Sequence, residues 1–361
     1  MGRLVVDTHV HAQRFAMSAE FRDAAASSPM VSYNDLADEI SRAAPYDNSH
    51  RLVADMGVYG VDMAILLPAF GMTNDLNVEI IERHPGRFAA VCAPVRTARR
   101  ALVEGIPWSA AEAAREIDDL LASGKFVGTG EGFPADSTRR RTISQTERMD
   151  QIRPLMEVAS RHRTVVRMHT GVCCGYPLTH HFWPETLHPA WVMDLAVEYP
   201  QVPIVLDHGG VQGWWSTRFV DEALLAAAAN DNVYLETGLW WSDLYGKALS
   251  DPNIGAEKLI WGCDWGSSIP FHTQPGGEPP VYAVQKRNEP PPNYQVDVWG
   301  WSLKQLLRLD VAQDDLNLIL GGNAARIYGL PLPHTRMFPP VSSSLRPQWG
   351  ERPAAYLGAS Q

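Results

Sequence analysis

Two histidines stand close together near the start of the chain, His9 and His11 in the run LVVDTHVHA. Residues i and i+2 of an extended chain project to the same side, so both imidazoles can reach one ion. Neutral imidazole is the commonest ligand for zinc and also suits iron, manganese and nickel. The pair therefore predicts part of a metal site whose other ligands come from elsewhere in the chain.

Ligand-type residues also end four later apolar runs: Glu131 in GTGEG, His169 in TVVRMH, His208 in VPIVLDH and Asp264 in EKLIWGCD. If these runs are parallel strands of one barrel, their carboxyl ends meet at one mouth. The predicted ligands of one or two divalent ions, of zinc, iron or manganese, are His9, His11, Glu131, His169, His208 and Asp264. Glu131 could bridge two ions, and Asp264 could bind the metal or take a proton from a metal-bound water.

Eight short runs are apolar almost without interruption, as strands buried on both faces are. They cover residues 4–7, 61–67, 87–95, 125–132, 164–169, 202–208, 232–237 and 257–264. Helical patterns lie between them, at 74–83, 109–122, 147–163, 189–198 and 217–229, and Ser109 is the expected N-cap of the strongest. This alternation predicts an α/β fold, a TIM-type (β/α)8 barrel with the metal site at the C-terminal face of the strands. An open doubly wound sheet is the alternative, but histidines replace the glycine-rich turn that usually follows its first strand.

The 361 residues suit one elaborated barrel, although two ordinary domains would also fit this length. We expect a single barrel domain over residues 1–332, with insertions at about 12–50 and 265–300 and an irregular tail over 333–361. The insertion at 265–300 is rich in Pro and Gly and follows the eighth strand, so it should lie over the metal site. The Pro- and Ser-rich tail could wrap the barrel or contact another subunit, so a homo-oligomer is compatible with the sequence.

A further set of residues follows the predicted strand ends and is expected to bind the substrate: His181, Trp183, Trp214, Trp215, Trp240, Trp241 and Trp265. The tryptophans predict a small-molecule substrate that is bulky, aromatic or apolar, and core packing is the alternative for each. His181 could instead belong to the structure of its loop. Glu236 is expected to support a metal ligand or to form a buried hydrogen bond. Arg167, on the strand face of His169, is expected to pair with a nearby carboxylate.

Charge and cysteine content argue against several classes of protein. The formal net charge is −10 and the only basic run is Arg139 to Arg141, so we do not expect a nucleic-acid-binding protein. The four cysteines include no CxxC pair, which disfavours a disulfide scaffold and favours a reducing cytosol. No apolar run reaches membrane-spanning length and no signal peptide precedes the first strand, so a cytoplasmic protein is predicted.

Five motifs, DTHVH, RMHTG, VLDHGG, WGCDWG and GGNAARIYGL, resemble the amidohydrolase superfamily in this order. They are most similar to its amidohydrolase-related branch, which includes aminocarboxymuconate semialdehyde decarboxylase. The resemblance implies a distorted barrel with one or two divalent ions, and it matches each predicted ligand except Glu131. It also implies that His208 is a second-metal ligand or an acid/base or substrate contact. Members with one metal often lack a carboxylate at the end of the fourth strand, so Glu131 at this place favours two ions. The absence of a proline shortly after Asp264 weakens the transfer of a particular substrate.

Three reactions fit these residues. The first is hydrolysis of a C–N or C–O bond, in an amide, ester or lactone, by a metal-activated water with Asp264 as general base. The second is non-oxidative decarboxylation of an aromatic or unsaturated acid, in which Asp264 protonates the ring carbon and His208 assists. The third is hydroxylation of a bulky apolar substrate by a non-heme di-iron oxygenase, because iron accepts the same ligands. A metal-holding protein without turnover is the non-enzyme alternative, and an open site with an available carboxylate base disfavours it.

Overall fold

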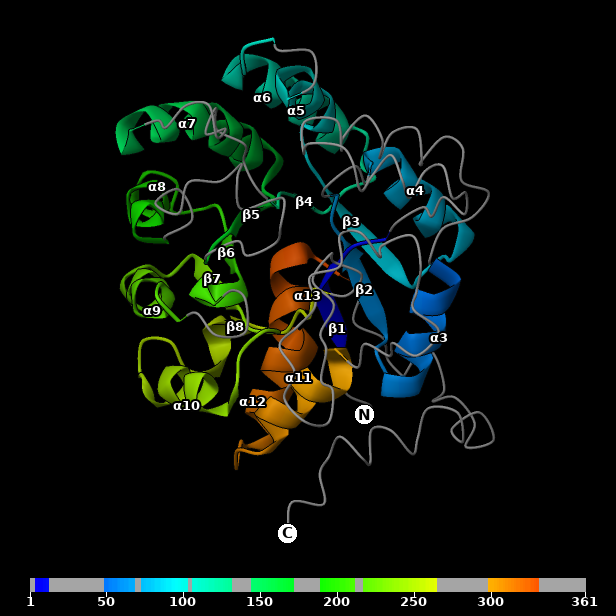
Figure 1. Ribbon diagram of the computed structural model, residues 1–361, viewed down its shortest axis with the longest axis vertical. Helices are drawn as coiled ribbons and strands as arrows, with labels where there is room; N and C mark the ends of the chain where they lie inside the picture. The colour runs from blue at the N-terminus through cyan, green and yellow to red at the C-terminus, as the bar shows by residue number, and fades with distance from the viewer. Residues whose placement is uncertain are drawn as a thin grey trace, which may run out of the picture.

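Eight short parallel strands form the centre of the folded molecule, and each pairs with the next in the order β1 to β8 (Figure 1). The computed structural model describes residues 4–12, 49–68, 73–102, 106–131, 144–171, 189–211, 217–264 and 298–330. The strands are β1 (Val6–Val10), β2 (Met63–Leu66), β3 (Phe88–Cys92), β4 (Gly128–Thr129), β5 (Val165–His169), β6 (Ile204–Asp207), β7 (Val233–Glu236) and β8 (Leu259–Ile260). The two ends of this sheet are joined because the Thr8 amide donates a hydrogen bond to the Trp261 carbonyl, with an N···O distance of 3.1 Å. The predicted (β/α)8 barrel is confirmed.

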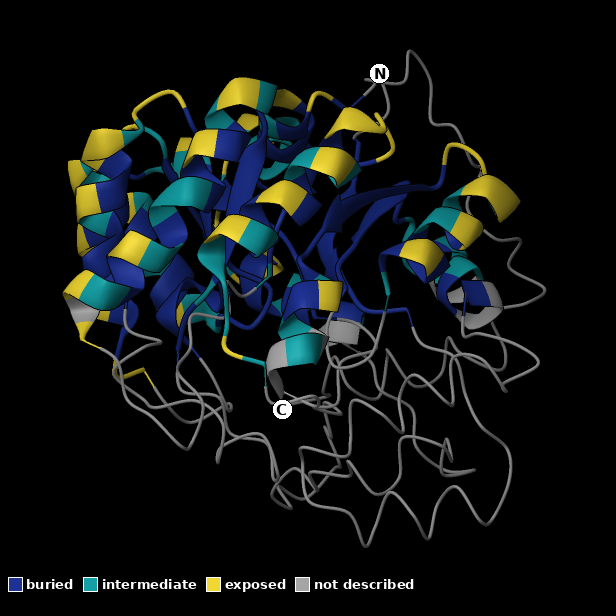
Figure 2. Cartoon of the chain, turned by 90° about the horizontal axis from the view of Figure 1, so that it is seen from above, coloured by how far each residue is buried: buried dark blue, intermediate teal, exposed yellow. Residues whose placement is uncertain are grey.

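Helices alternate with the strands and cover the outside of the barrel (Figure 2). They are α3 (Ser49–Tyr59), α4 (Asn74–Arg83), α5 (Val95–Leu102), α6 (Ala110–Ala122), α7 (Gln145–His162), α8 (Val192–Glu198), α9 (Val220–Ala229), α10 (Ser242–Ser250), α11 (Val298–Leu307), α12 (Gln313–Asn317) and α13 (Asn323–Tyr328). Short turns of helix are η3 (Pro189–Trp191), η4 (His208–Gly210), η5 (Ala256–Lys258) and η7 (Leu318–Gly322). The hydroxyl of Ser109 accepts a hydrogen bond from the Glu112 amide, which confirms the predicted N-cap of α6. Helix α7 begins before residue 147 because Ser144 caps it in the same way.

Several elements differ from the prediction. Strands β4 and β8 have two residues each, where strands over 125–132 and 257–264 were expected. After β4 the backbone turns at Gly130, whose φ is 130°, and a Cβ there would lie 2.5 Å from the Arg167 carbonyl oxygen. After β8, Trp261 and Cys263 stay buried without extending the strand. The residues at these places are apolar because they are buried, and not because they pair in a strand. Helices α3, α5 and α10 were not predicted, and Gly246 weakens the helical preference of α10.

The hydrophobic core has two layers. The outer layer lies between the strands and the helices and includes Leu66, Met168 and Leu206. The inner layer fills the barrel with alternate strand residues such as Ile65 and Val205. Figure 2 shows the strands as an almost entirely buried centre, with exposed residues on the outer faces of the helices.

Helix α13 completes the inner layer with Ala324, Ala325 and Tyr328, which pack in the same cluster as Leu4, two residues before β1. Asn323 holds the helix in place because its Nδ2 donates hydrogen bonds to the carbonyls of Ala256 and Leu259, both at 2.8 Å. The motif GGNAARIYGL therefore closes the N-terminal end of the barrel interior (Figure 1).

Parts of the predicted domain organisation lie outside the described residues. These parts are most of the insertion at 12–50, residues 265–297 of the second insertion and the tail after residue 332. Val298, expected to be in the second insertion, begins α11. In the described part of the chain, no helix combines the length and the apolar character needed to cross a bilayer.

Gly238, just after β7, allows the ends of β7 and β8 to touch. A Cβ at this position would lie 1.3 Å from the Gly262 carbonyl oxygen, whereas a Cβ at Gly246 in α10 meets no atom within 4 Å. We expect Gly238→Ala to lower the free energy of unfolding by about 3 kcal/mol or more. Gly246→Ala, the matched control, should be neutral or stabilise by about 0.5–1 kcal/mol. Urea unfolding measures both, and equal stability of the two variants would contradict this close approach.

Candidate metal centre

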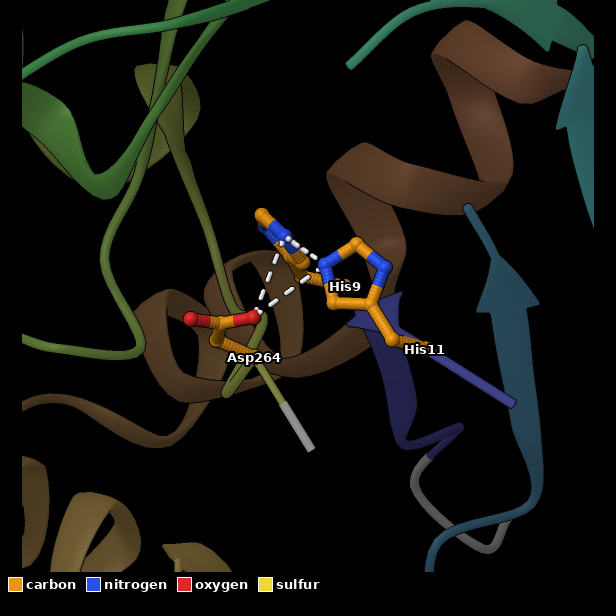
Figure 3. Close-up of side chains that lie close together, drawn as sticks. All are labelled: His9, His11 and Asp264. Atoms are coloured by element: carbon orange, nitrogen blue, oxygen red, sulfur yellow. Dashed lines mark hydrogen bonds and ion pairs between the residues drawn. The ribbon is translucent and has the colours of Figure 1, made fainter. Parts of the chain in front are cut away.

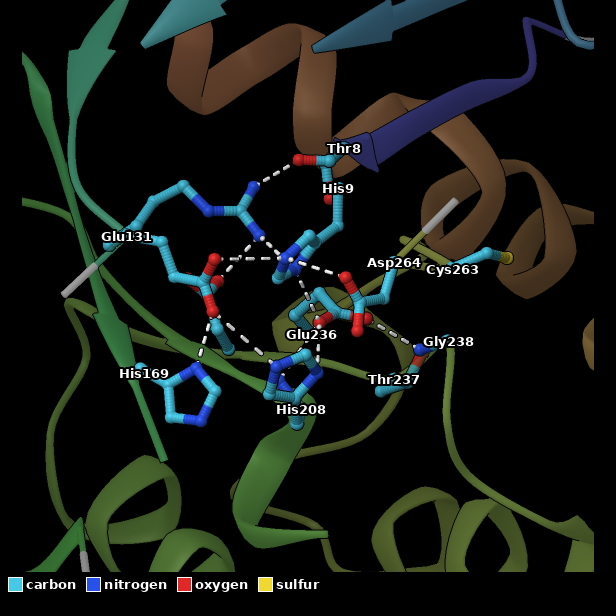
Figure 4. A network of polar contacts seen from close by, with 12 residues as sticks. Thr8, His9, Glu131, His169, His208, Glu236, Thr237, Gly238, Cys263 and Asp264 are labelled. Carbon is cyan, nitrogen blue, oxygen red and sulfur yellow. Dashed lines mark hydrogen bonds and ion pairs between the residues drawn. The ribbon is translucent and has the colours of Figure 1, made fainter. Parts of the chain in front are cut away.

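All six predicted metal ligands meet at the carboxyl ends of five strands (Figures 3 and 4). They are His9 and His11 from β1 and the residue after it, Glu131 after β4, His169 at the end of β5, His208 after β6 and Asp264 after β8. Residues far apart in the sequence are thus brought within contact distance, as the strand-end argument requires. That they bind a metal ion stays a prediction, which the geometry of their ligand atoms can support.

Four of these residues form a first group around the Nε2 atoms of His9 and His11, which lie 3.0 Å apart. Glu131 Oε2 lies 3.3 Å from each of these two nitrogens. Asp264 Oδ1 lies 3.5 Å from His9 Nε2 and 3.2 Å from His11 Nε2 (Figure 3). Each of the two carboxylate oxygens therefore lies close to both imidazole nitrogens.

The other oxygen of Glu131 faces a second group. Glu131 Oε1 contacts His169 Nδ1 and lies 3.5 Å from His208 Nε2. The rings of His169 and His208 lie edge to face, with centroids 4.8 Å apart. Glu131 consequently presents one oxygen to each group (Figure 4). The two groups adjoin, because the rings of His9 and His208 stack with centroids 4.9 Å apart.

The hydrogen bonds behind the rings show that the first group suits a cation. His11 Nδ1 lies 3.0 Å from the Leu67 carbonyl, which can only accept, so this nitrogen carries a proton and Nε2 offers its lone pair. His9 Nδ1 lies 3.1 Å from Glu236 Oε2, which places the proton of His9 on the same side. The neutral rings therefore direct two acceptor nitrogens at each other and at two carboxylate oxygens. Acceptors this close need a cation or protons between them, and the donor set is one that divalent metals take.

A third group of ligand atoms lies deeper, formed by His9, Asp207 and Glu236. The guanidinium of Arg167 already fills it, because Arg167 forms an ion pair with Asp207 and its Nη2 lies 3.2 Å from His9 Nδ1. The expected pairing of Arg167 with a carboxylate is confirmed. A fixed cation at this position makes the third group a support for the centre rather than another metal site.

The buried carboxylates set the protonation of the histidines. Burial by itself lowers the pKa of His11, but hydrogen bonds to Asp264 and Glu131 raise it to about 9. Burial also opposes the charged form of His9, yet the charges of Glu131 and Asp264 raise the pKa of His9 well above its usual value. Burial by itself would raise the pKa of Glu131 and of Asp264, but the neighbouring imidazoles lower both. Without metal, protons on imidazole balance the carboxylate charge.

Two of the candidate catalytic residues have an uncommon backbone conformation. His208 and Asp264 have φ values of 63° and 57°, in the left-handed region that side chains other than glycine rarely adopt. Gly209 and Gly210 follow His208 with φ values of 52° and 80°, and a Cβ at Gly210 would lie 2.4 Å from the Phe219 carbonyl oxygen. The HGG sequence thus permits the sharp turn that aims the His208 ring at the centre. Strain of about 1–3 kcal/mol per residue at such positions is typical of functional sites.

The predicted substrate-binding residues are only partly described. His181, Trp183, Trp214, Trp215 and Trp265 lie outside the described residues. Trp240 is fully buried in the outer core, and its indole nitrogen donates a hydrogen bond to the His208 carbonyl at 3.1 Å. Trp241 is partly buried and precedes α10. Trp240 therefore supports the backbone of a candidate ligand, and a substrate contact for either residue stays a prediction.

Asp7 has a role that sequence reasoning missed. It is fully buried and accepts hydrogen bonds from the amides of His9 and Cys263, at 2.9 and 3.0 Å, and from the Trp299 indole. Burial raises the pKa of Asp7 to about 6, against these hydrogen bonds. Asp7 thereby aligns the backbone of two segments of the first group, the one at the end of β1 and the one after β8, with α11. Its place as the first residue of DTHVH was a signal. The hydrogen bond from Trp299 could not be predicted, since nothing in the sequence links residues so far apart.

A family model described as amidohydrolase matches residues 6–330. The chain belongs to the amidohydrolase family. This confirms the resemblance of the five sequence motifs, and amidohydrolases are metal-dependent enzymes that typically hold divalent ions. A search of curated proteins found no match.

Solved structures of other amidohydrolases share the fold. The 5-carboxyvanillate decarboxylase LigW from Sphingomonas paucimobilis has 16% sequence identity and a TM-score of 0.54, over 91% of this chain and 100% of that chain. An amidohydrolase from Burkholderia multivorans with bound zinc has 13% identity and a TM-score of 0.53, over 91% of this chain and 100% of that chain. Identities this low establish a common barrel, and they leave the reaction to be argued from the residues of this chain.

Metal binding should depend on pH, because His9 and His11 must be neutral to bind an ion. Their raised pKa values mean that the ion displaces protons at neutral pH, so affinity rises as the pH increases towards about 9. We expect the apparent affinity for zinc to rise by about tenfold or more per pH unit through the neutral range. Titration against a competing chelator measures this, and a pH-independent affinity would contradict the arrangement.

The stability of chelator-treated protein should show the reverse trend. A histidine with a raised pKa in the folded state contributes stability that is complete below its unfolded pKa of 6.5 and is lost as the pH rises through the folded value of about 9. We therefore expect the melting temperature of the chelator-treated protein to fall across this window. Zinc-loaded protein is the control and should not share this fall.

Proposed function

We propose that this protein is a metal-dependent hydrolase that cleaves a C–N or C–O bond of a small molecule, such as an amide, ester or lactone, at a centre of two divalent ions. Glu131 carries the proposal, because its Oε2 faces His9 and His11 whereas its Oε1 faces His169 and His208. Membership of the amidohydrolase family supports metal-dependent catalysis. The choice of hydrolysis rests on the placement of Glu131 and Asp264.

Each ion would have its own ligands. His9, His11 and Asp264 would hold the first ion, His169 and His208 the second, and Glu131 would bridge them. Zinc, iron and manganese all suit such a set of imidazoles and carboxylates. A bound ion of this kind lowers the pKa of water towards about 7 and polarises a carbonyl group.

Asp264 is placed to move the proton. Its Oδ1 faces His9 and His11, and its other oxygen points away from both rings (Figure 3). The pKa of Asp264 is lowered, so the carboxylate is ionised at neutral pH and can accept a proton. In the proposed reaction Asp264 takes a proton from the attacking water as the water oxygen bonds to the carbonyl carbon. The bond from that carbon to the leaving nitrogen or oxygen then breaks, and Asp264 returns the proton to the leaving atom.

His208 suits the role of ligand better than that of acid or base. Its Nε2 lies 3.5 Å from Glu131 Oε1, and its Nδ1 lies 3.5 Å from Glu236 Oε2. Both ring nitrogens therefore face residues of the centre, and the ring is almost fully buried. The substrate is proposed to be bulky, aromatic or apolar, on the tryptophans that follow the strand ends in the sequence.

Decarboxylation and oxygenation are the competing reactions, since they use the same ligands. A decarboxylase must bring the carboxylate of its substrate to the metal, and Glu131 already places a buried negative charge between the two groups. This charge favours a neutral carbonyl substrate over an acid. A di-iron oxygenase would need iron and oxygen, which makes the metal itself a test of that alternative.

Replacing Asp264 by Asn removes the proposed base while keeping a side chain of the same size. We expect kcat for the active members of a panel of amides, esters and lactones to fall by about 10²–10⁴-fold, with zinc still bound at saturating concentration. Asp119→Asn, on the exposed face of α6, is the matched control and should leave kcat unchanged. Hydrolysis rates and elemental analysis of the same samples provide the measurement.

Other outcomes would overturn the proposal. Release of carbon dioxide from an aromatic acid by protein with one ion per chain would indicate a decarboxylase. Iron in the purified protein together with substrate-dependent oxygen uptake would indicate an oxygenase. Hydrolysis that Asp264→Asn leaves unaffected would show that Asp264 is not the base.

Replacing Glu131 by Gln tests the number of ions. A neutral amide cannot bridge two cations well, so we expect the metal content to fall from about two ions per chain to about one or fewer. Glu157→Gln, exposed on α7, is the matched control. Elemental analysis measures the content, and wild-type protein that holds only one ion would count against the two-ion centre.

A further inference from the structure

Glu236 lies behind the metal centre and contacts two of its candidate ligands. It ends β7 and is fully buried. Its Oε2 lies 3.1 Å from His9 Nδ1 and accepts a hydrogen bond from the His208 amide at 2.9 Å. Its Oε1 accepts one from the Gly238 amide at 2.7 Å. One carboxylate oxygen thus connects a residue of the first ligand group with a residue of the second (Figure 4).

Close packing of three strand ends places Glu236 there. A Cβ on Gly262 would lie 2.7 Å from Thr8 Oγ1, 3.0 Å from His9 Cβ and 3.1 Å from Glu236 Cγ. Gly262 therefore leaves room for Glu236 to reach His9. The hydrogen bond from Gly238 fixes the other oxygen, so the carboxylate cannot rotate away.

Arg167 opposes Glu236 at the same atom of His9. Its Nη2 lies 3.2 Å from His9 Nδ1, and a guanidinium can only donate. Acting alone, Arg167 would favour the neutral ring that accepts at Nδ1 and carries its proton on Nε2. Such a ring could not bind an ion through Nε2, the atom that faces the first ligand group.

Arg167 cannot move away from this position. It is fully buried, pairs with Asp207, donates to the Thr8 carbonyl and lies 3.1 Å from the Tyr328 hydroxyl. The opposing donor is therefore a permanent part of the barrel interior, and only Glu236 offers His9 Nδ1 an acceptor among the described residues.

We propose that Glu236 is a positioning residue that keeps the proton of His9 on Nδ1 against the donor Arg167, so that His9 Nε2 is free to bind the ion. Through the His208 amide, the same oxygen also holds the backbone of the second ligand group. The inference rests on the metal centre of the proposed function and not on the reaction catalysed there.

Metal affinity of Glu236→Gln tests the proposal directly. We expect zinc to bind about 10–100-fold more weakly, as is usual when the carboxylate behind a ligand histidine is lost. Glu116→Gln is the matched control. Glu116 is also a buried carboxylate, and it accepts hydrogen bonds from the backbone amides of Arg96 and Thr97, which are not part of the metal centre. The control should lose stability and keep its zinc affinity. Equal zinc affinity of Glu236→Gln and wild type would overturn the proposal.

A spectroscopic test uses the wild-type protein and does not depend on the folding of a variant. In zinc-loaded protein with 15N-labelled histidine, the ring proton of His9 should reside on Nδ1 and resonate downfield because a carboxylate accepts it. A His9 ring that carries its proton on Nε2, with zinc on Nδ1, would show the proposal to be wrong.

A combined variant separates the role of Arg167 from general packing. In a background of Arg167→Met with Asp207→Asn, the cation and its counter-charge are both absent, and Glu236→Gln should then lose most of its effect on zinc affinity. An undiminished effect would show that Glu236 does not act against Arg167. Absence of hydrolysis with normal zinc affinities would instead count against the proposed reaction alone.

Discussion

Hydrogen-bond acceptors buried around one point at the barrel mouth are the constraint on which the rest of the structure depends. The Nε2 atoms of His9 and His11 lie 3.0 Å apart there, and one oxygen of Glu131 and one of Asp264 each lie within 3.5 Å of both nitrogens. Burying so many acceptors is unfavourable unless positive charge stands between them. Protons on His9 and His11 supply that charge without metal, and divalent ions supply it better, because they also satisfy the coordination preference of each ligand.

The barrel interior is layered to support this point. Alternate strand residues and the α13 side chains form an apolar floor at the N-terminal end. Arg167 lies above that floor as a fixed cation, paired with Asp207 and beside Glu236. The six candidate ligands lie at the strand ends beyond it. Glycines at the ends of β7 and β8 permit these layers to approach, so the polar centre depends on backbone contacts that larger residues would prevent.

Fold and function are separable in this protein. The barrel and the family establish a metal-dependent enzyme framework, and the same framework carries decarboxylases and hydrolases in other proteins. What favours hydrolysis is local: a carboxylate between two groups of ligands and an ionised Asp264 with one oxygen directed away from them. We further infer that Glu236 and Arg167, which contact His9 at Nδ1 rather than at Nε2, select the tautomer of His9 that can bind an ion.

The sequence by itself determined the barrel and the residues that meet at its mouth. Parallel strands buried on both faces are apolar, and the polar residues that follow them lie at one end of the barrel. The sequence therefore sufficed to place four motifs together: DTHVH, RMH, LDH and GCD. Tertiary structure alone decided how Glu131 divides its oxygens, that Trp299 donates to Asp7, and that Arg167 and Glu236 compete for one nitrogen of His9. Those contacts join residues from different strands and helices, and their geometry depends on side-chain directions that no local pattern encodes. The sequence overestimated the lengths of β4 and β8 for a related reason. A run of apolar residues is expected wherever a segment is buried, whether or not the segment pairs as a strand.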